Sequence, residues 1–242
     1  KTMSEAVEVL RQFKGFSYFT EMSDIINRLE DHVVSARMKA TPVIDFEKNE
    51  SLKGLDYLDT IYHAIVNEHP IQLKYRSFKA RSANSFIFYP YLLKEYRNRW
   101  FVYGVRGNGR ILQNLALDRI QSLEVLPQQH YIKNTFFDPN TFFDDLVGVT
   151  KNSGSVAEKV GFKVAAAEAP YIITKPIHRS QQVVERLADG SVILEIEVVI
   201  NHELERVFFG YAEGIQVLYP KTLVELMGRK LKKAAEQYTH SK

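Results

Sequence analysis

Ile71-Gln72-Leu73-Lys74-Tyr75 is the first stretch of this chain in which apolar and polar side chains strictly alternate. A period of two is typical of a β-strand that buries one face. The alternation predicts that Ile71, Leu73 and Tyr75 share the buried face, while Gln72 and Lys74 share the other. Residues 71–75 therefore mark a change from helical to β structure.

Further strands are predicted downstream of this stretch, at residues 85–91, 100–105, 110–116 and 120–126. Polar or glycine-containing turns separate them at residues 79–84, 95–98 and 107–109. Five short strands in some sixty residues favour a small closed or nearly closed β-barrel of the Sm or SH3 kind.

Helical periodicity dominates the sequence upstream of residue 71. Apolar side chains recur at helical intervals in residues 4–39, which predicts two helices. Residues 40–52 contain Pro42 and a polar run, and are typical of a linker. A short helix is expected next, because one face collects the apolar side chains before Pro70: Leu55, Leu58, Ile61, Tyr62 and Ile65.

The last third of the chain alternates between strands and helices. Strands are predicted at 160–164, 183–186, 192–199 and 215–218, and helices at 165–171, 202–211 and 222–238. The order βαββαβ with a terminal helix indicates a ferredoxin-like domain. The expected class is thus α+β, with a helical linker region (1–52), a barrel (53–130), a connector (131–157) and a ferredoxin-like domain (158–242).

Composition narrows the possible functions. At 45% hydrophobic and 25% charged residues, with no apolar run of about 20 residues, the sequence indicates a globular chain with no membrane span. The absence of cysteine excludes disulfides and thiolate sites and, with no signal peptide at the start, favours the cytoplasm. A net charge of only +3 argues against a nonspecific grip on duplex DNA by the whole chain.

Three blocks of sequence resemble the landmarks of the bacterial WYL domain. They are Tyr89-Pro90-Tyr91-Leu92-Leu93, Arg99-Trp100-Phe101-Val102 and Leu115-Ala116-Leu117-Asp118-Arg119-Ile120. The entry segment, from Ala64-Ile65 to Ile71-Gln72-Leu73-Lys74-Tyr75, also matches. Further on, residues 185–192 and Val217-Leu218-Tyr219-Pro220 are similar to the extension domain that follows WYL domains.

The resemblance implies the sensor half of a bacterial transcription regulator. Residues 1–52 resemble the region that joins such sensors to a winged helix-turn-helix, and that DNA-reading head is expected to be missing from this chain. Promoter DNA would then be bound only through the head. Two departures bear on the ligand: Phe101-Val102 replaces the usual Tyr-Leu, and Gln113-Asn114 stands where many members have an arginine.

Arginines and aromatic residues are interleaved along the predicted barrel. Arginine binds phosphate through two parallel hydrogen bonds and aromatic rings stack on bases, so the mixture suits a nucleotide or a single-stranded nucleic acid. A solvated surface with strand-pairing aromatics is the alternative. The resemblance favours a ligand site, for which we predict Tyr75, Arg81, Tyr91, Arg97, Trp100, Arg106 and Arg119.

Two of the residues in these blocks have a competing structural interpretation. Trp100, the only tryptophan, could equally pack in the core. Asp118 is expected to position its neighbours through an ion pair or a turn bond.

The sequence offers little support for an enzyme. No two of the seven histidines have the spacing of a helical zinc motif, and no carboxylate is placed beside a second acid or a nucleophile. We therefore expect no catalytic residue, no metal and no cofactor. The expected partners are a nucleotide or single-stranded nucleic-acid effector and further copies of the chain as a homo-oligomer. The rival functions are direct single-stranded nucleic-acid binding without signalling, and a purely structural dimerisation module.

Overall fold

The structure is a computed structural model that describes residues 53–107, 109 and 111–239. The two helices predicted in residues 4–39 and the linker at 40–52 lie outside the described residues. The chain divides into two compact units, Lys1–Phe136 and Phe137–Lys242. Each unit has its own hydrophobic core.

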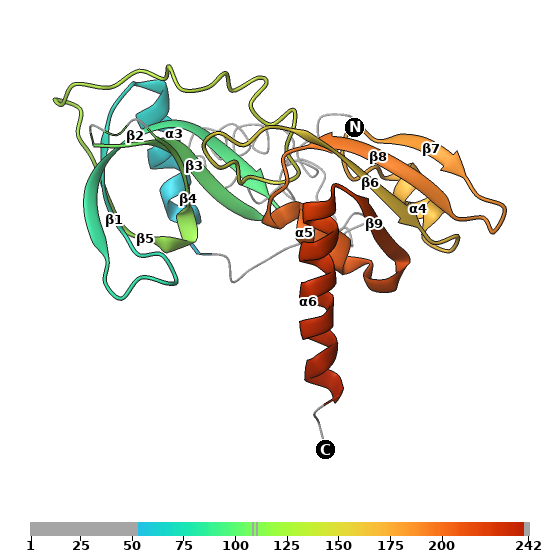
Figure 1. The fold of residues 1–242 in the computed structure, drawn as a ribbon. Coiled ribbons are helices and arrows are strands. Elements are labelled where there is room, and N and C mark those ends of the chain that lie inside the picture. Colours follow the sequence, from blue (N-terminus) through green and yellow to red (C-terminus); the bar gives the residue numbers. More distant parts are fainter. Residues whose placement is uncertain (1–52, 108, 110, 240–242) are drawn as a thin grey trace, which may run out of the picture. The chain divides into compact units, whose positions relative to one another are not determined.

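The first unit is an antiparallel sheet with a helix packed on it (Figure 1). A helical turn η3 (Leu55–Tyr57) and helix α3 (Leu58–Val66) precede the strands. The strands are β1 (Ile71–Tyr75), β2 (Asn84–Tyr96), β3 (Arg99–Arg106), β4 (Leu112–Ala116) and β5 (Ile120–Val125), and the turn η4 (Leu117–Arg119) joins the last two. They lie in the order β4-β3-β2-β1-β5.

The predicted closure of this sheet into a barrel is wrong. β4 pairs with β3 and β5 pairs with β1, but in the described part of the chain no ladder joins β4 to β5. The three residues of η4 turn the chain at this point instead of continuing a strand. The sheet is therefore open, with β4 and β5 at its edges.

Alternation along β1 places the core of the unit as expected. Ile71 and Leu73 are fully buried in one cluster with Leu58 and Ile61 of α3. Gly104 of β3 lies beside Phe88, another member of this cluster, and a Cβ atom at Gly104 would come within 2.8 Å of the Phe88 ring. The absence of a side chain at this position lets Phe88 pack closely over the sheet.

The hairpin between β2 and β3 is longer than predicted. β2 continues to Tyr96, so the turn is reduced to Arg97 and Asn98, which have φ values of 50° and 61°. Two successive positive φ values match the right-handed twist of the paired strands. The register of β2 against β3 shifts between Pro90 and Leu92, so Tyr91 is a bulged residue.

The second unit has the predicted order of strands and helices. It comprises β6 (Glu158–Val164), α4 (Ala169–Thr174), β7 (Gln182–Arg186), β8 (Val192–Val198), α5 (His202–Gly210), the turn η5 (Ala212–Gly214), β9 (Ile215–Tyr219) and α6 (Lys221–Thr239). The antiparallel strands lie in the order β7-β8-β6-β9.

The second sheet is buried at its centre and exposed along one edge. Phe162 of β6 and Leu194 of β8 are fully buried in one cluster with Ile172 of α4 and Phe208 of α5. Every residue of the edge strand β7 is exposed. No helix in the described part of the chain is both long and apolar enough to cross a membrane.

A buried asparagine holds the loop that precedes β6 through hydrogen bonds. Asn201 caps α5, because its side-chain oxygen accepts a hydrogen bond from the backbone N–H of Leu204 at 2.9 Å. Its amide nitrogen donates to the backbone oxygens of Val147 and Thr150, both at 2.9 Å. One side chain thus satisfies a helix end and two loop carbonyls at once.

Replacing Asn201 by alanine should destabilise the second unit by about 2–4 kcal/mol, because the cap and two buried carbonyl partners are lost together. Denaturation followed by circular dichroism measures this loss. Tryptophan fluorescence reports the first unit alone, because Trp100 is the only tryptophan, and its transition should not move. The control is Asn152→Ala, which changes an exposed asparagine. Equal curves for both variants would contradict the role of Asn201.

Candidate ligand-binding site

Arg119, Tyr75 and Phe78 form a contact cluster at one end of the first sheet. The Arg119 guanidinium lies 4.5 Å from the centre of the Phe78 ring. It also lies close enough to the Tyr75 side chain for its positive charge to act on the phenol. Burial raises the pKa of Tyr75 above its ordinary value of 10.0, although the positive charge of Arg119 opposes the shift. Tyr75 is therefore a neutral hydrogen-bonding group at neutral pH.

Asp118 holds two arginines beside this cluster. Its side chain is only 10% exposed, and Oδ2 lies 3.3 Å from Nε of Arg99. Oδ1 lies 3.7 Å from Nε of Arg119, which is an ion-pair distance too long for a hydrogen bond. Consistent with this, neither of these two buried atoms has a hydrogen-bond partner. The carboxylate thus holds both cations through charge.

A second arginine–aromatic pair lies on the same face of the sheet. The Arg106 guanidinium is 4.1 Å from the centre of the Phe86 ring. Phe86 pairs with Leu73 across the strands, so it shares the face on which Leu73 and Tyr75 lie. Arg106 is exposed at the end of β3. This face thus carries two arginines, each stacked on a ring.

Tyr91, a predicted site residue, lies elsewhere. Its ring is 8% exposed, stacks on Phe136 and meets Tyr131 edge to face. Tyr131 also contacts Tyr89, whose side chain lies on the face opposite Phe88, so Tyr91 belongs to that opposite face. Burial raises the pKa of Tyr91 to about 12, and the neighbouring Tyr89 adds to the shift. Alternation along β2 gives the same placement, because Tyr89 and Tyr91 are two residues apart and share a face.

The other predicted residues are spread over the unit. Arg81 is exposed in the loop between β1 and β2. Arg97 is exposed at the tip of the β2–β3 hairpin, 5.5 Å from the centre of the Tyr96 ring. Trp100 is half-buried and packs against the core. The structure therefore places Tyr75 and Arg119 near each other and Arg106 on the face of Tyr75, and it separates Tyr91 from them. That all seven residues bind a ligand stays a prediction.

The sequence patterns did not single out Phe78, and they gave Arg99 no specific partner. Phe78 is 73% exposed and stands in the loop Arg76-Ser77-Phe78-Lys79-Ala80-Arg81. An isolated phenylalanine between basic residues in a loop without glycine was the available signal. The pairing of Arg99 with Asp118 depends on the turn η4, which no periodicity predicts.

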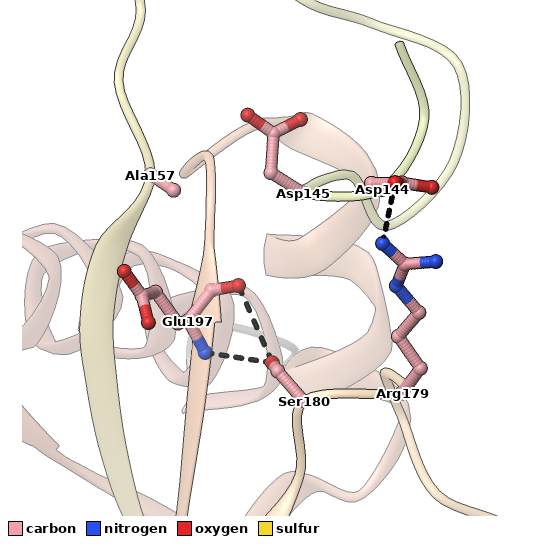
Figure 2. A pocket seen from close by; sticks show the side chains of 6 residues that line it. All are labelled: Asp144, Asp145, Ala157, Arg179, Ser180 and Glu197. Atoms are coloured by element: carbon pink, nitrogen blue, oxygen red, sulfur yellow. Dashed lines mark hydrogen bonds and ion pairs between the residues drawn. The ribbon is translucent and has the colours of Figure 1, made fainter. Parts of the chain in front are cut away.

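An open hollow of about 440 Å3 lies in the second unit. Figure 2 shows its lining, where Arg179 pairs with Asp144 at 2.6 Å and Ser180 bonds to the Glu197 backbone. Asp145 is paired with Lys151 at 2.7 Å. Arg179, the one basic residue of this lining, is already paired within the chain. We therefore place the candidate site in the first unit.

His178 is buried next to this hollow. Its Nδ1 accepts a hydrogen bond from the backbone N–H of Ser180 at 3.2 Å and lies 2.7 Å from the Ser180 hydroxyl. Burial lowers the pKa of His178 below its ordinary value of 6.5, although a hydrogen bond with the Asp144 backbone opposes the shift. His178 is thus a neutral structural group at pH 7. Throughout the described residues, no group of three or more histidine and carboxylate side chains is arranged to hold a metal ion.

Two family models match the chain. The model of the WYL domain matches residues 56–125, and the model of the WCX domain matches residues 157–235. The WYL match falls within the first unit and the WCX match within the second. No curated protein matches the chain.

Two solved structures match most of the chain at low sequence identity. Proteasome accessory factor B/C (PafBC) of Arthrobacter aurescens is 16% identical, with a TM-score of 0.32 over 79% of this chain. A CRISPR Cas-related protein is 11% identical, with a TM-score of 0.45 over 77% of this chain. The chain spans 28% of the length of the first and 52% of the second.

Replacing Asp118 by asparagine should leave Arg99 and Arg119 without their shared countercharge. We expect the first unit to lose about 1–2 kcal/mol, a value reduced for solvent screening because the Arg99 side chain is 43% exposed. Denaturation followed by Trp100 fluorescence is the measurement. Asp56→Asn, which changes an exposed carboxylate of the same unit, is the control. A variant as stable as the parent would show that Asp118 does not hold the two arginines.

Acid should destabilise the second unit through His178. The pKa of His178 is lower in the folded than in the unfolded protein, so the unfolded state binds the proton more tightly and stability falls as pH drops below about 6.5. One proton contributes at most about 1.4 kcal/mol per pH unit. Denaturation followed by circular dichroism between pH 7.5 and 5 should give a steeper loss for the parent than for His178→Gln. Parallel pH dependences would refute the assignment.

Proposed function

We propose that this chain, with a WYL domain followed by a WCX domain, is the effector-sensing part of a transcription regulator. The effector is nucleotide-like or an oligonucleotide, and its binding controls a DNA-binding head attached to the sensor. The chain acts as a homo-oligomer and catalyses no reaction. The observation that supports this most directly is the pair of ring-stacked arginines on one face of the first sheet, Arg119 on Phe78 and Arg106 on Phe86.

Stacking prepares an arginine to bind phosphate. A ring beneath the guanidinium plane restricts its motion, while the N–H donors point outward along the edges of the plane. Phosphate accepts two parallel hydrogen bonds from such a fork. Arg119 is also paired with Asp118, so a ring and a carboxylate together hold its guanidinium before a ligand arrives.

Positive charge is concentrated in the segment of sequence that forms most of the first sheet and its loops. Between residues 74 and 119 the chain has ten basic and two acidic residues, although the net charge of the whole chain is only +3. A local excess of this size attracts a polyanion and accelerates its association. The distribution favours a phosphate-bearing effector over a neutral metabolite.

Arg106→Ala should weaken binding of a fluorescein-labelled ten-nucleotide oligothymidylate by about tenfold to a hundredfold, the effect of losing one charged hydrogen bond. Arg97→Ala is expected to act in the same direction. Fluorescence anisotropy gives the affinities. Arg186→Ala, an exposed arginine of β7, is the control and should bind like the parent.

Trp100→Ala should reduce stability as well as binding, because the ring is packed against the core. Thermal melts beside the titrations separate the two effects. If both arginine variants bind the oligonucleotide as tightly as the parent, the proposed site is wrong. If a single nucleotide competes fully at low salt sensitivity, the ligand is a small nucleotide and not a nucleic-acid strand.

A further inference from the structure

Phe78 is the only exposed phenylalanine among those that the structure describes. It stands in the loop of residues 76–83 between β1 and β2, and its side chain is 73% exposed. Burial in the core therefore does not explain a phenylalanine at this position. A ring of this size in water leaves a large apolar area free to stack on a ligand.

The loop that carries Phe78 is held in place by hydrogen bonds. The backbone N–H of Arg76 donates to the carbonyl oxygen of Arg119 at 3.1 Å, and that of Ala80 donates to Ser77 at 3.0 Å. Nε of Arg76 reaches the carbonyl oxygen of Ala80 at 3.4 Å. The ring is thus presented from a braced turn, which lowers the entropy lost when a ligand stacks on it.

The two faces of the Phe78 ring have different surroundings. Arg119 covers one face with its guanidinium, 4.5 Å from the ring centre. With the side chain 73% exposed, the other face remains accessible to a planar ligand. Lys79 and Arg81, both exposed, follow in the same loop and place positive charge close to the ring.

We infer that Phe78 is the stacking platform for a nucleobase of the effector, with Arg119 fixed behind the ring and Lys79 and Arg81 neutralising the adjoining phosphates. The inference rests on the proposed function, and it adds the residue that recognises the base as distinct from those that bind phosphate. Stacking on an aromatic ring is tolerant of sequence, because every base has a planar face. The site therefore selects nucleotides over other phosphates without selecting among bases.

The test uses the full chain and a ten-nucleotide oligothymidylate that carries one 2-aminopurine, whose fluorescence is quenched when it stacks. The parent should bind and quench the probe. Phe78→Leu keeps an apolar side chain but removes the ring, and should weaken binding by about fivefold to a hundredfold and abolish the quenching. Phe78→Trp should preserve both. Tyr171→Leu is the control, because it removes an aromatic side chain of the other unit that is 69% exposed.

The outcomes separate this inference from the proposed function. If the parent binds but Phe78→Leu binds and quenches equally well, Phe78 is not the platform, while the sensor proposal stands. If Phe78→Leu binds more weakly with unchanged quenching, the ring gives only apolar contact and the inference is wrong. If neither the oligonucleotide nor a single nucleotide binds the parent, both proposals fail.

Discussion

The burial of two side chains of β1 determines on which side of the first sheet every other residue lies. Ile71 and Leu73 are enclosed by Leu58 and Ile61 of α3, so the face of β1 is not free to invert. A slip of one residue would move both side chains into water and the polar side chains between them into the core. The registers of β1 with β2 and β5 then determine which face each residue of those strands occupies. The positions of Arg106 and Arg119 at the candidate site depend on these registers.

Local patterns predicted the strands and helices of both units well, because alternation and helical periodicity record which side chains are buried. They gave the wrong answer on closure, because a barrel was expected and the sheet is open. Whether β4 and β5 pair depends on the twist of the sheet and the geometry of η4, and neither leaves a periodic trace in the sequence.

The candidate site was predicted in part for a related reason. Alternation placed Tyr75 on the buried face, and composition drew attention to the arginines. The contacts that make a site, such as Arg119 on Phe78 and Asp118 between two arginines, arise from loops and turns. In the second unit, Asn201 caps α5 locally, but its hydrogen bonds to the backbone of Val147 and Thr150 join residues some fifty positions apart and have no local signal.

The exposed edge strand β7 has a consequence for the behaviour of the protein at high concentration. An unpaired strand edge offers its backbone N–H and C=O groups to the edge of another molecule, and Val183 and Val184 give this edge two exposed β-branched side chains. The register of β7 shifts between Val183 and Glu185, which breaks the regular spacing of those groups. Glu185 and Arg186 then place opposite charges where a foreign strand would have to lie flat. The irregular, charged strand β7 thus keeps the sheet of the second unit from serving as a template for aggregation.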